Sequence, residues 1–542
     1  MPHLTGGQAL VQSLLREGIV AVFGLPGVQL DWAFDALYEA RERITVYHTR
    51  HEQATSYMAD GYARSTGRTG VCLVVPGPGL LNAMAGLATA YACNSPVLCL
   101  AGQIQSDLIG AGRGLLHEIP NQLEMMASVT KWAGRAMQPE AIPGLVREAF
   151  QQMRSGRPRP VALEIPPDVL ARRAEVALLD PAPLARPAGD PALLRQAAAA
   201  LARAARPLIF AGGGVLVAEA WEELRALAEA LQAPVVMSAN GRGALSDRHP
   251  LALPPAAGRL LLPRADVVLA VGTRFVQPAV EWGLPPGATT IQIDVDPAEV
   301  GRNARPTLGI AGDARVCLAE LTSALPARRP PSRAREVAAV REHLADLLFE
   351  IQPQAAYTAA LRAALPEDGI LVGDMTQVGY FARNGFPVYQ PRTLLGPGYQ
   401  GTLGSGLPMA LGAQVGNPDR KVVSINGDGG FLFNVQELAT MKQHRLGVVA
   451  VVFNDGAFGN VKRIQEQQFG GRTIASDLIN PDFLQLARAF GIDGLRATTP
   501  AALEGALREA LATDGPVLIE APVGPMPSTW GLQHLPVTRD WW

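Results

Sequence analysis

Short apolar runs rich in β-branched residues alternate with helical patterns along the chain. The clearest case is the stretch 421–453, where Lys421–Ile425 and Val448–Phe453 have the composition of buried strands. Between these runs, 434–444 carries apolar side chains at helical spacing, at Val435, Leu438, Ala439 and Met441. A strand, a helix and a second strand joined by short turns predict a right-handed βαβ unit in a parallel sheet.

The same alternation occurs in three blocks that are separated by two proline-containing stretches. The predicted domains are residues 1–170, 191–325 and 333–542, and the predicted linkers are Asp180–Asp190 and Pro326–Ser332. A chain of 542 residues fits about three domains of roughly 150–200 residues each. The sequence therefore predicts an α/β fold of three doubly wound parallel-sheet domains.

Composition limits the class of protein. Hydrophobic residues make up 48% of the chain, and 47 basic residues nearly balance 49 acidic ones. There is no basic tract for nucleic acid or an anionic membrane, and no apolar run approaches the ~18 residues of a membrane span. Met1–Gly24 has no signal-peptide pattern, and the four cysteines lack metal-ligand spacing. We expect a cytoplasmic protein with no nucleic-acid or membrane partner.

Two acidic turns follow the two predicted strands of the βαβ unit. Asp428 lies in a Gly-Asp-Gly-Gly turn, and Asp455 lies in an Asn-Asp-Gly turn. In open parallel sheets ligands bind outside the carboxyl ends of the strands, where both aspartates are expected. Gly429 and Gly430 allow close approach of the backbone to an anion, and Mg²⁺ prefers carboxylate and phosphate oxygens. The pattern predicts a site for a metal ion and a diphosphate.

The segment Ile425–Gly459 resembles the thiamine diphosphate signature of the superfamily that contains acetolactate synthase, pyruvate decarboxylase and benzoylformate decarboxylase. The resemblance implies thiamine diphosphate and Mg²⁺ as cofactors. It implies that Asp428 binds the metal, that Asp455 occupies a position usually held by asparagine, and that the Ala457 carbonyl is a further ligand. It also identifies the three blocks, in order, as pyrimidine-binding, central and diphosphate-binding domains.

The first block contains the other half of such a site. The motif Thr49-Arg50-His51-Glu52-Gln53, and the segment from Glu52 to Gly79, resemble acetolactate synthases. In that family a glutamate at this place protonates N1′ of the aminopyrimidine ring, so the resemblance assigns that role to Glu52. A buried carboxyl with a raised pKa suits such a role. Pro76 lies in the same segment, and we expect it to contact the cofactor.

The third block adds three expected contacts. Gly401-Thr402-Leu403-Gly404 resembles the segment in which an apolar side chain holds the cofactor in a V shape, which assigns that role to Leu403. The Gly401 carbonyl is expected to accept a hydrogen bond from the 4′-amino group. The loop 373–377 resembles a diphosphate-contacting loop, with Gln377 as the contact.

The central block argues against FAD. Its VGTRF and IDVDPAEVGRN segments resemble the family's central domain, where acetolactate synthases bind FAD. The glycine-rich segment of those enzymes is missing here, and Val276-Gln277-Pro278 replaces their acidic pair and arginine. Gly212–Gly214 follows a strand, but the spacing differs from the dinucleotide fingerprint, so a simple turn is favoured.

Four residues are expected to decide which substrate reacts: Val28, Gln29, His117 and Ile464. His117 is the most distinctive, because a histidine could transfer protons to a reaction intermediate, although a histidine satisfied by a loop hydrogen bond is an equal alternative.

The leading functional interpretation is acetolactate synthase-like chemistry, in which a 2-oxo acid is decarboxylated and the resulting enamine undergoes carboligation. Alternatives are simple decarboxylation of a 2-oxo acid, or cleavage of a diketone or a 2-hydroxyacyl thioester on the same cofactor. A non-catalytic homologue is disfavoured by the presence of Glu52, Asp428 and Asp455. The partners implied by the resemblance are small 2-oxo acids or other carbonyl compounds. A second copy of the chain is also implied, in a homodimer or homotetramer with active sites at the subunit interface.

Overall fold

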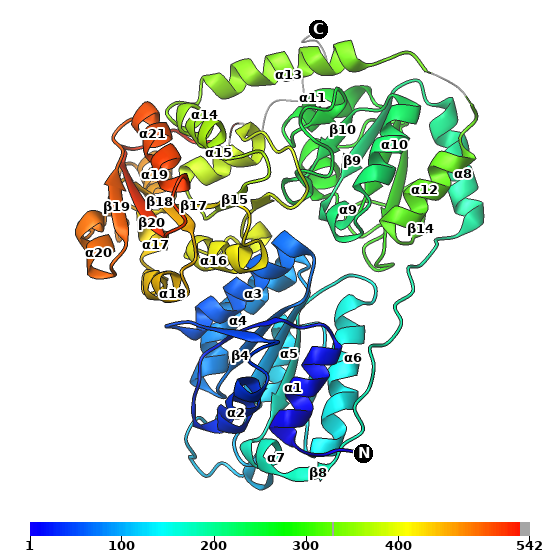
Figure 1. The fold of residues 1–542 in the computed structure, drawn as a ribbon. Helices are drawn as coiled ribbons and strands as arrows, with labels where there is room; N and C mark the ends of the chain where they lie inside the picture. Colours follow the sequence, from blue (N-terminus) through cyan, green and yellow to red (C-terminus); the bar gives the residue numbers. More distant parts are fainter. Residues whose placement is uncertain (328–329, 530, 532–542) are drawn as a thin grey trace.

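A computed structural model describes residues 1–327, 330–529 and 531. The chain forms three α/β domains, each built on a six-stranded parallel sheet with helices on both faces (Figure 1). This arrangement confirms the predicted fold class. The last residues of the expected third domain, 532–542, lie outside the described part. No described helix has the length and apolarity needed to cross a membrane.

In the first domain the sheet has the order β3-β2-β4-β5-β7-β6. Its strands are β2 (Ala21–Gly24), β3 (Thr45–His48), β4 (Gly70–Val74), β5 (Val97–Gly102), β6 (Ala133–Arg135) and β7 (Val161–Ile165). The helices are α1 (Gly6–Arg16), α2 (Asp31–Glu39), α3 (Glu52–Thr66), α4 (Pro78–Cys93), α5 (Gln122–Val129), α6 (Ile142–Arg154) and α7 (Pro167–Ala171). A short antiparallel pair, β1 (His3–Thr5) with β8 (Arg173–Glu175), joins the two ends of the domain.

In the central domain the sheet has the order β11-β10-β9-β12-β13-β14. Its strands are β9 (Pro207–Ala211), β10 (Val235–Met237), β11 (Ala252–Leu253), β12 (Val267–Val271), β13 (Thr289–Asp294) and β14 (Leu308–Ala311). The helices are α8 (Pro191–Arg203), α9 (Gly213–Val217), α10 (Trp221–Leu231), α11 (Ala257–Leu261) and α12 (Ala314–Ala324). The long helix α13 (Ala334–Phe349) follows the second linker and buries Val337, Val340 and Leu344 in the central core.

In the third domain the sheet has the order β16-β15-β17-β18-β20-β19. Its strands are β15 (Ile370–Gly373), β16 (Leu394–Leu395), β17 (Val422–Gly427), β18 (Val448–Asn454), β19 (Asp493–Arg496) and β20 (Val517–Pro522). The helices are α14 (Gln354–Ala364), α15 (Gln377–Gly385), α16 (Gly406–Gly416), α17 (Asp428–Phe431), α18 (Glu437–Gln443), α19 (Gly459–Gln468), α20 (Phe483–Ala489) and α21 (Pro500–Leu511).

The predicted βαβ unit is present, with a shorter helix than its apolar pattern suggested. Strands β17 and β18 pair in parallel, with Ile425 opposite Val451. The helix between them was expected over 434–444, but α18 covers only Glu437–Gln443. The reason lies at Asn434, whose buried amide donates to the Gly404 carbonyl and holds that residue in a turn. A separate short helix, α17, occupies the acidic turn itself.

The first and third domains share one hydrophobic core, at the crossing of α3 and α16 (Figure 1). A methyl group at Gly61 would overlap the Met409 carbonyl, and one at Gly412 would overlap the Met58 carbonyl. The two backbones can approach this closely only because both positions lack a Cβ atom. The crossing fixes the start of α3, where Glu52 lies, relative to the sheet of the third domain.

Candidate active site

The structure brings the two predicted aspartates together at the carboxyl ends of neighbouring strands. Asp428 accepts hydrogen bonds from the backbone nitrogens of Gly429 (2.9 Å) and Gly456 (2.9 Å) and from Asn480 Nδ2 (2.6 Å). Asp455 follows β18, and its pKa is raised to about 7 by burial and by the nearby Asp428 carboxylate. The structure thus places two carboxyl groups close enough for each to oppose ionisation of the other.

The donor set of this pair fits a hard divalent cation. Two carboxylates are a common protein contribution to Mg²⁺, whose other positions go to phosphate and water oxygens. The described residues contain no cluster of three or more His, Cys, Asp and Glu side chains suited to a metal, so the rest of a coordination shell would need other oxygens. Ala457 is held nearby by flanking backbone hydrogen bonds, from Leu478 to Gly456 (2.7 Å) and from Phe458 to Ser476 (2.8 Å).

Asn480 is a member of this site that the sequence reasoning missed. Its amide nitrogen donates to Asp428 Oδ2 and to Asn454 Oδ1 (2.9 Å), while its own Oδ1 is buried without a hydrogen-bond partner. A buried acceptor without a partner is costly unless a ligand or water supplies a donor or a cation. Asn480 lies 52 residues after Asp428, in a loop with no recognisable motif, so only the fold places it here.

The glycines of the acidic turn are enclosed by the third domain. A Cβ atom at Gly429 would lie 2.5 Å from the ring of Phe458, and Gly430 lies next to the Asp374 carboxylate. Asp374 is fully buried, and burial raises its pKa to about 6. It accepts hydrogen bonds from the backbone nitrogens of Met375 (2.6 Å) and Gly406 (3.1 Å). Asp374 thereby ties the loop 373–377 to the segment that follows Gly404.

Gln377 contacts α19, the helix that carries Ile464. Gln377 is buried at the first position of α15, and its Oε1 accepts a hydrogen bond from Arg463 Nη1 (3.3 Å) on α19. Ile464 is the next residue of α19 and is half-buried. The structure therefore places the expected diphosphate contact beside a helix that carries an expected substrate residue.

The segment 401–404 contacts the first domain. Gly401 adopts φ +62°, in the left-handed region that favours glycine, and Leu403 is half-buried. Thr402 Oγ1 hydrogen-bonds to Tyr57 OH on α3 (2.9 Å). The loop expected to support the cofactor ring is thus attached to the first domain of the same chain.

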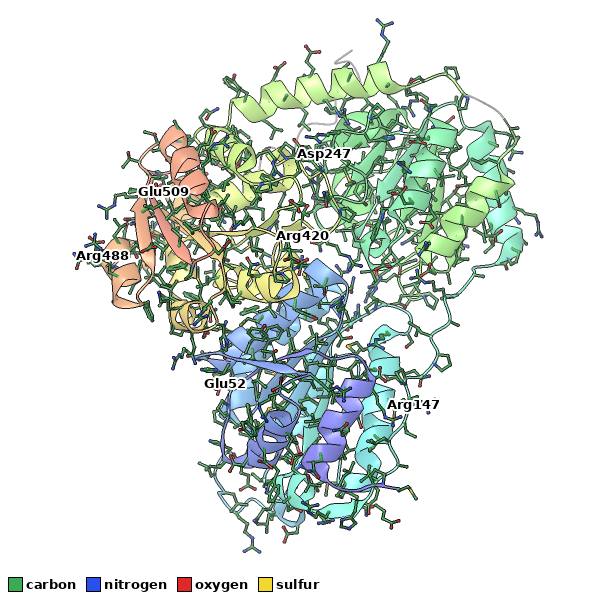
Figure 2. The ribbon with its side chains drawn as sticks, in the orientation of Figure 1. Glu52, Arg147, Asp247, Arg420, Arg488 and Glu509 are labelled. Carbon is green, nitrogen blue, oxygen red and sulfur yellow. The ribbon has the colours of Figure 1, made fainter. Side chains whose placement is uncertain are left out.

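Glu52 stands at the first position of α3 and is half-buried rather than buried in the single chain. Asn82 Nδ2 donates to its Oε2 (3.0 Å). Two residues earlier, Arg50 donates its backbone N–H to both oxygens of Glu437 in the third domain (3.1 and 3.2 Å), which anchors the start of the helix. Figure 2 marks Glu52 in the first domain. Within the described residues no hydrogen bond or ion pair links it to Asp428 or Asp455.

His117 and Gln29 are in direct contact. His117 Nδ1 lies 3.0 Å from Gln29 Oε1, and Gln29 Nε2 donates to the Leu116 carbonyl (3.1 Å). Gln29 is 8% exposed, whereas its neighbour Val28 is 61% exposed. Pro76 is buried next to this pair, since a Cβ atom at Gly102 would lie 2.8 Å from Pro76 and 3.4 Å from Gln29.

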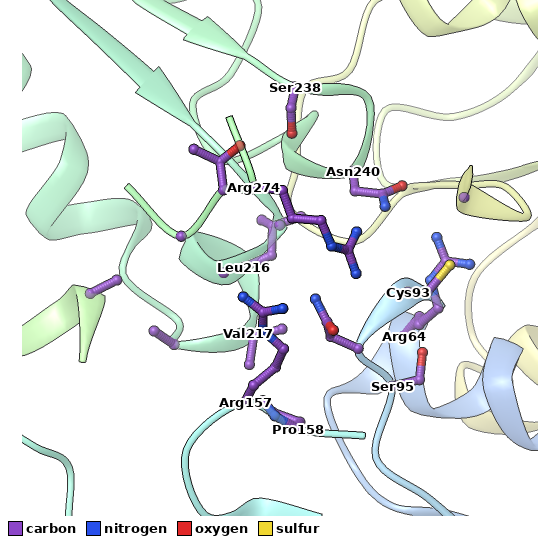
Figure 3. A pocket seen from close by; sticks show the side chains of 18 of the residues that line it. Arg64, Cys93, Ser95, Arg157, Pro158, Leu216, Val217, Ser238, Asn240 and Arg274 are labelled. Carbon is purple, nitrogen blue, oxygen red and sulfur yellow. The ribbon is translucent and has the colours of Figure 1, made fainter. Parts of the chain in front are cut away.

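A second feature that the sequence did not indicate is a cavity of about 990 Å³ where the three domains meet (Figure 3). Arg157, Asn240 and Arg274 surround it, from the first and central domains. Gly213 and Gly214, expected to form a simple turn, instead begin α9 and also line it. None of the predicted site residues lines this cavity.

Comparison with protein families gives three matches that together cover most of the chain. Residues 4–125 match the thiamine pyrophosphate enzyme N-terminal TPP binding domain. Residues 194–321 match the central domain of the same enzymes, and residues 374–521 match their C-terminal TPP binding domain.

Individual relatives align along nearly the whole chain. A probable acetolactate synthase large subunit of Methanocaldococcus jannaschii is 35% identical over 96% of this chain and 92% of its own length. A probable 2-ketoarginine decarboxylase of Pseudomonas aeruginosa is 38% identical over 95% of this chain and 94% of its own length. The acetolactate synthase isozyme 3 large subunit of Escherichia coli is 34% identical over 94% of this chain and 93% of its own length.

Proposed function

This chain belongs to the acetolactate synthase-like family of thiamine diphosphate-dependent enzymes, which make or break C–C bonds, and on that premise we propose that it decarboxylates a 2-oxo acid with Mg²⁺ as the second cofactor. The proposal is supported by the clustering of Asp428 and Asp455 at the ends of adjacent strands, with the pKa of Asp455 raised to about 7. Such a pair calls for a cation, and a cation there would bind a diphosphate.

The third domain would hold the cofactor by its charged end. We infer that Asp428, Asp455 and the Ala457 carbonyl would bind Mg²⁺. Gly429, Gly430 and Gln377 would line the diphosphate. When bound, thiamine diphosphate supplies the electron sink that makes loss of carbon dioxide feasible.

The aminopyrimidine end of the cofactor would be held by residues of the first and third domains. Leu403 would pack against the cofactor, and the Gly401 carbonyl would accept from its amino group. Glu52 would hold a proton at the aminopyrimidine N1′. Glu52 begins α3 in the first domain, whereas Asp428 and Asp455 lie in the third. From the family resemblance we infer that a second copy completes each site, in a homodimer or homotetramer.

After carbon dioxide leaves, the substrate carbon that carried it can be protonated, which yields an aldehyde, or can add to a second carbonyl compound. The sequence put carboligation first, and the acetolactate synthase relatives support it. The contact between His117 and Gln29 favours protonation, because it holds an imidazole in place beside the turn that follows β4. The relationship to a probable 2-ketoarginine decarboxylase agrees with that preference. We therefore propose decarboxylation with release of an aldehyde as the main reaction, and carboligation as the second candidate.

The direct test incubates the purified protein with thiamine diphosphate, Mg²⁺ and a panel of 2-oxo acids that includes pyruvate and 2-ketoarginine. Products are identified by mass spectrometry, and carbon dioxide release is followed in parallel. An aldehyde supports the main proposal, and acetolactate from pyruvate supports the second candidate. No carbon dioxide from any 2-oxo acid would refute both.

A further inference from the structure

The side-chain amide of Gln29 contacts the loop 115–118 through two hydrogen bonds. Its nitrogen donates to the Leu116 carbonyl and its oxygen faces His117 Nδ1. A carbonyl oxygen only accepts, so the amide NH₂ group must face Leu116 and the amide oxygen must face the ring. That oxygen also only accepts, so Nδ1 must carry the hydrogen of this bond. The contacts thus determine one tautomer of the neutral imidazole.

The backbone around His117 is restrained as well. His117 has φ +69°, which is rare for a residue with a Cβ atom. Its carbonyl lies so close to Gly77 that a methyl group there would overlap it. The Gly77 N–H in turn donates to Gln122 Oε1 (2.9 Å), and Gln122 Nε2 donates to the buried Glu164 (2.7 Å). The backbone that carries the His117 ring is therefore fixed by this close approach and by the buried hydrogen bonds.

The segment around Gly77, which follows β4, lies between His117 and Glu52. Gly77 contacts the His117 carbonyl, and a Cβ atom at Gly79 would lie 3.4 Å from Glu52 Oε1. Other charged groups on the surrounding segments are Glu118 in the same loop and Asp31, two residues after Gln29. No described residue hydrogen-bonds to His117 Nε2, which leaves that nitrogen for a reactant.

We propose that Gln29 is a positioning residue that fixes the proton on His117 Nδ1 and so makes Nε2 the atom that exchanges the catalytic proton. The assignment of a catalytic proton rests on the proposed function, whereas the tautomer rests on geometry alone. In the proton step the imidazolium Nε2–H bond breaks, and the proton joins the electron pair left on carbon when carbon dioxide departs. The neutral imidazole keeps its Nδ1–H bond to Gln29 and regains its second proton from water.

The test compares Gln29→Met, which removes both hydrogen bonds, with Gln29→Glu, which keeps an acceptor facing Nδ1 and adds a negative charge. Gln138→Met, an exposed glutamine of the first domain, is the matched control. The first readout needs no substrate: diethyl pyrocarbonate modifies neutral imidazole, and peptide mapping follows His117 among the eight histidines as pH is varied.

We expect the pH of half-maximal His117 modification to rise by about one unit in Gln29→Glu, because a carboxylate stabilises the imidazolium. In Gln29→Met it should fall, and in the control it should not change. With a 2-oxo acid substrate, Gln29→Met should lower kcat about tenfold or more with little change in KM, and Gln29→Glu should recover part of that loss with a shifted pH profile.

The result that would overturn the inference is an unchanged His117 modification profile in both Gln29 variants, even if the enzyme decarboxylates its substrate. A uniform loss of activity at every pH, with that profile unchanged, would likewise reduce Gln29 to a structural residue. Shifted modification profiles without turnover of any 2-oxo acid would refute the proposed function while supporting the role of Gln29.

Discussion

At the residue scale, the family resemblance implies that Asp455 occupies a position usually held by asparagine, and the aspartate adds an ionisable group to the proposed metal site. Burial and Asp428 raise the pKa of Asp455 to about 7, so the side chain takes up a proton near neutral pH when no cation is present. A bound cation favours the carboxylate and must displace that proton. Metal affinity should therefore depend on pH in a range where an asparagine would not titrate.

We predict that Mg²⁺ binds more weakly as pH falls below 7. The apparent affinity, measured with thiamine diphosphate present, should decrease by nearly tenfold per pH unit below the pKa of about 7. Asp455→Asn should remove most of this dependence between pH 5.5 and 7.5. Calorimetric titration of both proteins at several pH values provides the measurement. Equal slopes for the two proteins would show that another group controls metal binding.

Glu52 is predicted to act in chemistry and not in folding. Glu52→Gln keeps the shape and the hydrogen bond to Asn82 but removes the proton exchange, so turnover should fall by about 10²–10⁴-fold. Thermal stability and cofactor affinity should change little. Glu148→Gln, an exposed residue of α6, serves as the control. Unchanged turnover of Glu52→Gln would remove the catalytic assignment.

At the scale of elements, the crossing of α3 and α16 fixes the position of Glu52, the first residue of α3, relative to the third domain. The two glycines at the crossing allow backbone to meet backbone, which the apolar pattern of either helix does not reveal. Asn434 acts similarly, because its bond to the Gly404 carbonyl shortens α18. Contacts between elements, rather than local propensity, decide such details.

Gly61→Ala should be destabilising although alanine is the better helix former. Its methyl group would overlap the Met409 carbonyl, so we expect a loss of about 2 kcal/mol or more, seen as a lower midpoint of denaturant unfolding. Gly505→Ala in α21 is the matched control, because its methyl group meets nothing within 4 Å. The control should gain up to ~1 kcal/mol. A Gly61→Ala protein as stable as the parent would show that the crossing can relax.

At the scale of the whole molecule, Glu52 and His117 lie in the first domain and the aspartate pair lies in the third, as two separate parts of the proposed site. Large apolar side chains are exposed near both parts. Leu116, next to His117 in the sequence, is 65% exposed, and Ile479, next to Asn480, is fully exposed. Contiguous exposed apolar patches are typical of an interface, and these side chains are candidate members of one. A second chain would bury them and bring a Glu52 to an aspartate pair.

Subunit complementation tests this arrangement. Glu52→Gln and Asp428→Asn homo-oligomers should each be inactive, but a mixture that is allowed to exchange subunits should regain about a quarter of the parental activity. The reason is that a hybrid dimer contains one site free of both substitutions. Each variant exchanged with itself is the control. No recovery, despite hybrids seen by native mass spectrometry, would place both halves of a site in one chain.

The sequence alone determined the three-domain α/β fold, because buried strands, turns and amphipathic helices leave local patterns. It also predicted that Asp428 and Asp455 lie together, since short turns after adjacent strands must meet at one sheet edge. Only the tertiary structure placed Asn480 next to Asp428, joined Asp374 to the backbone of Gly406, paired Gln29 with His117, and showed the cavity between the domains. The physical reason is that these contacts join residues far apart in sequence, and their geometry depends on how whole elements pack.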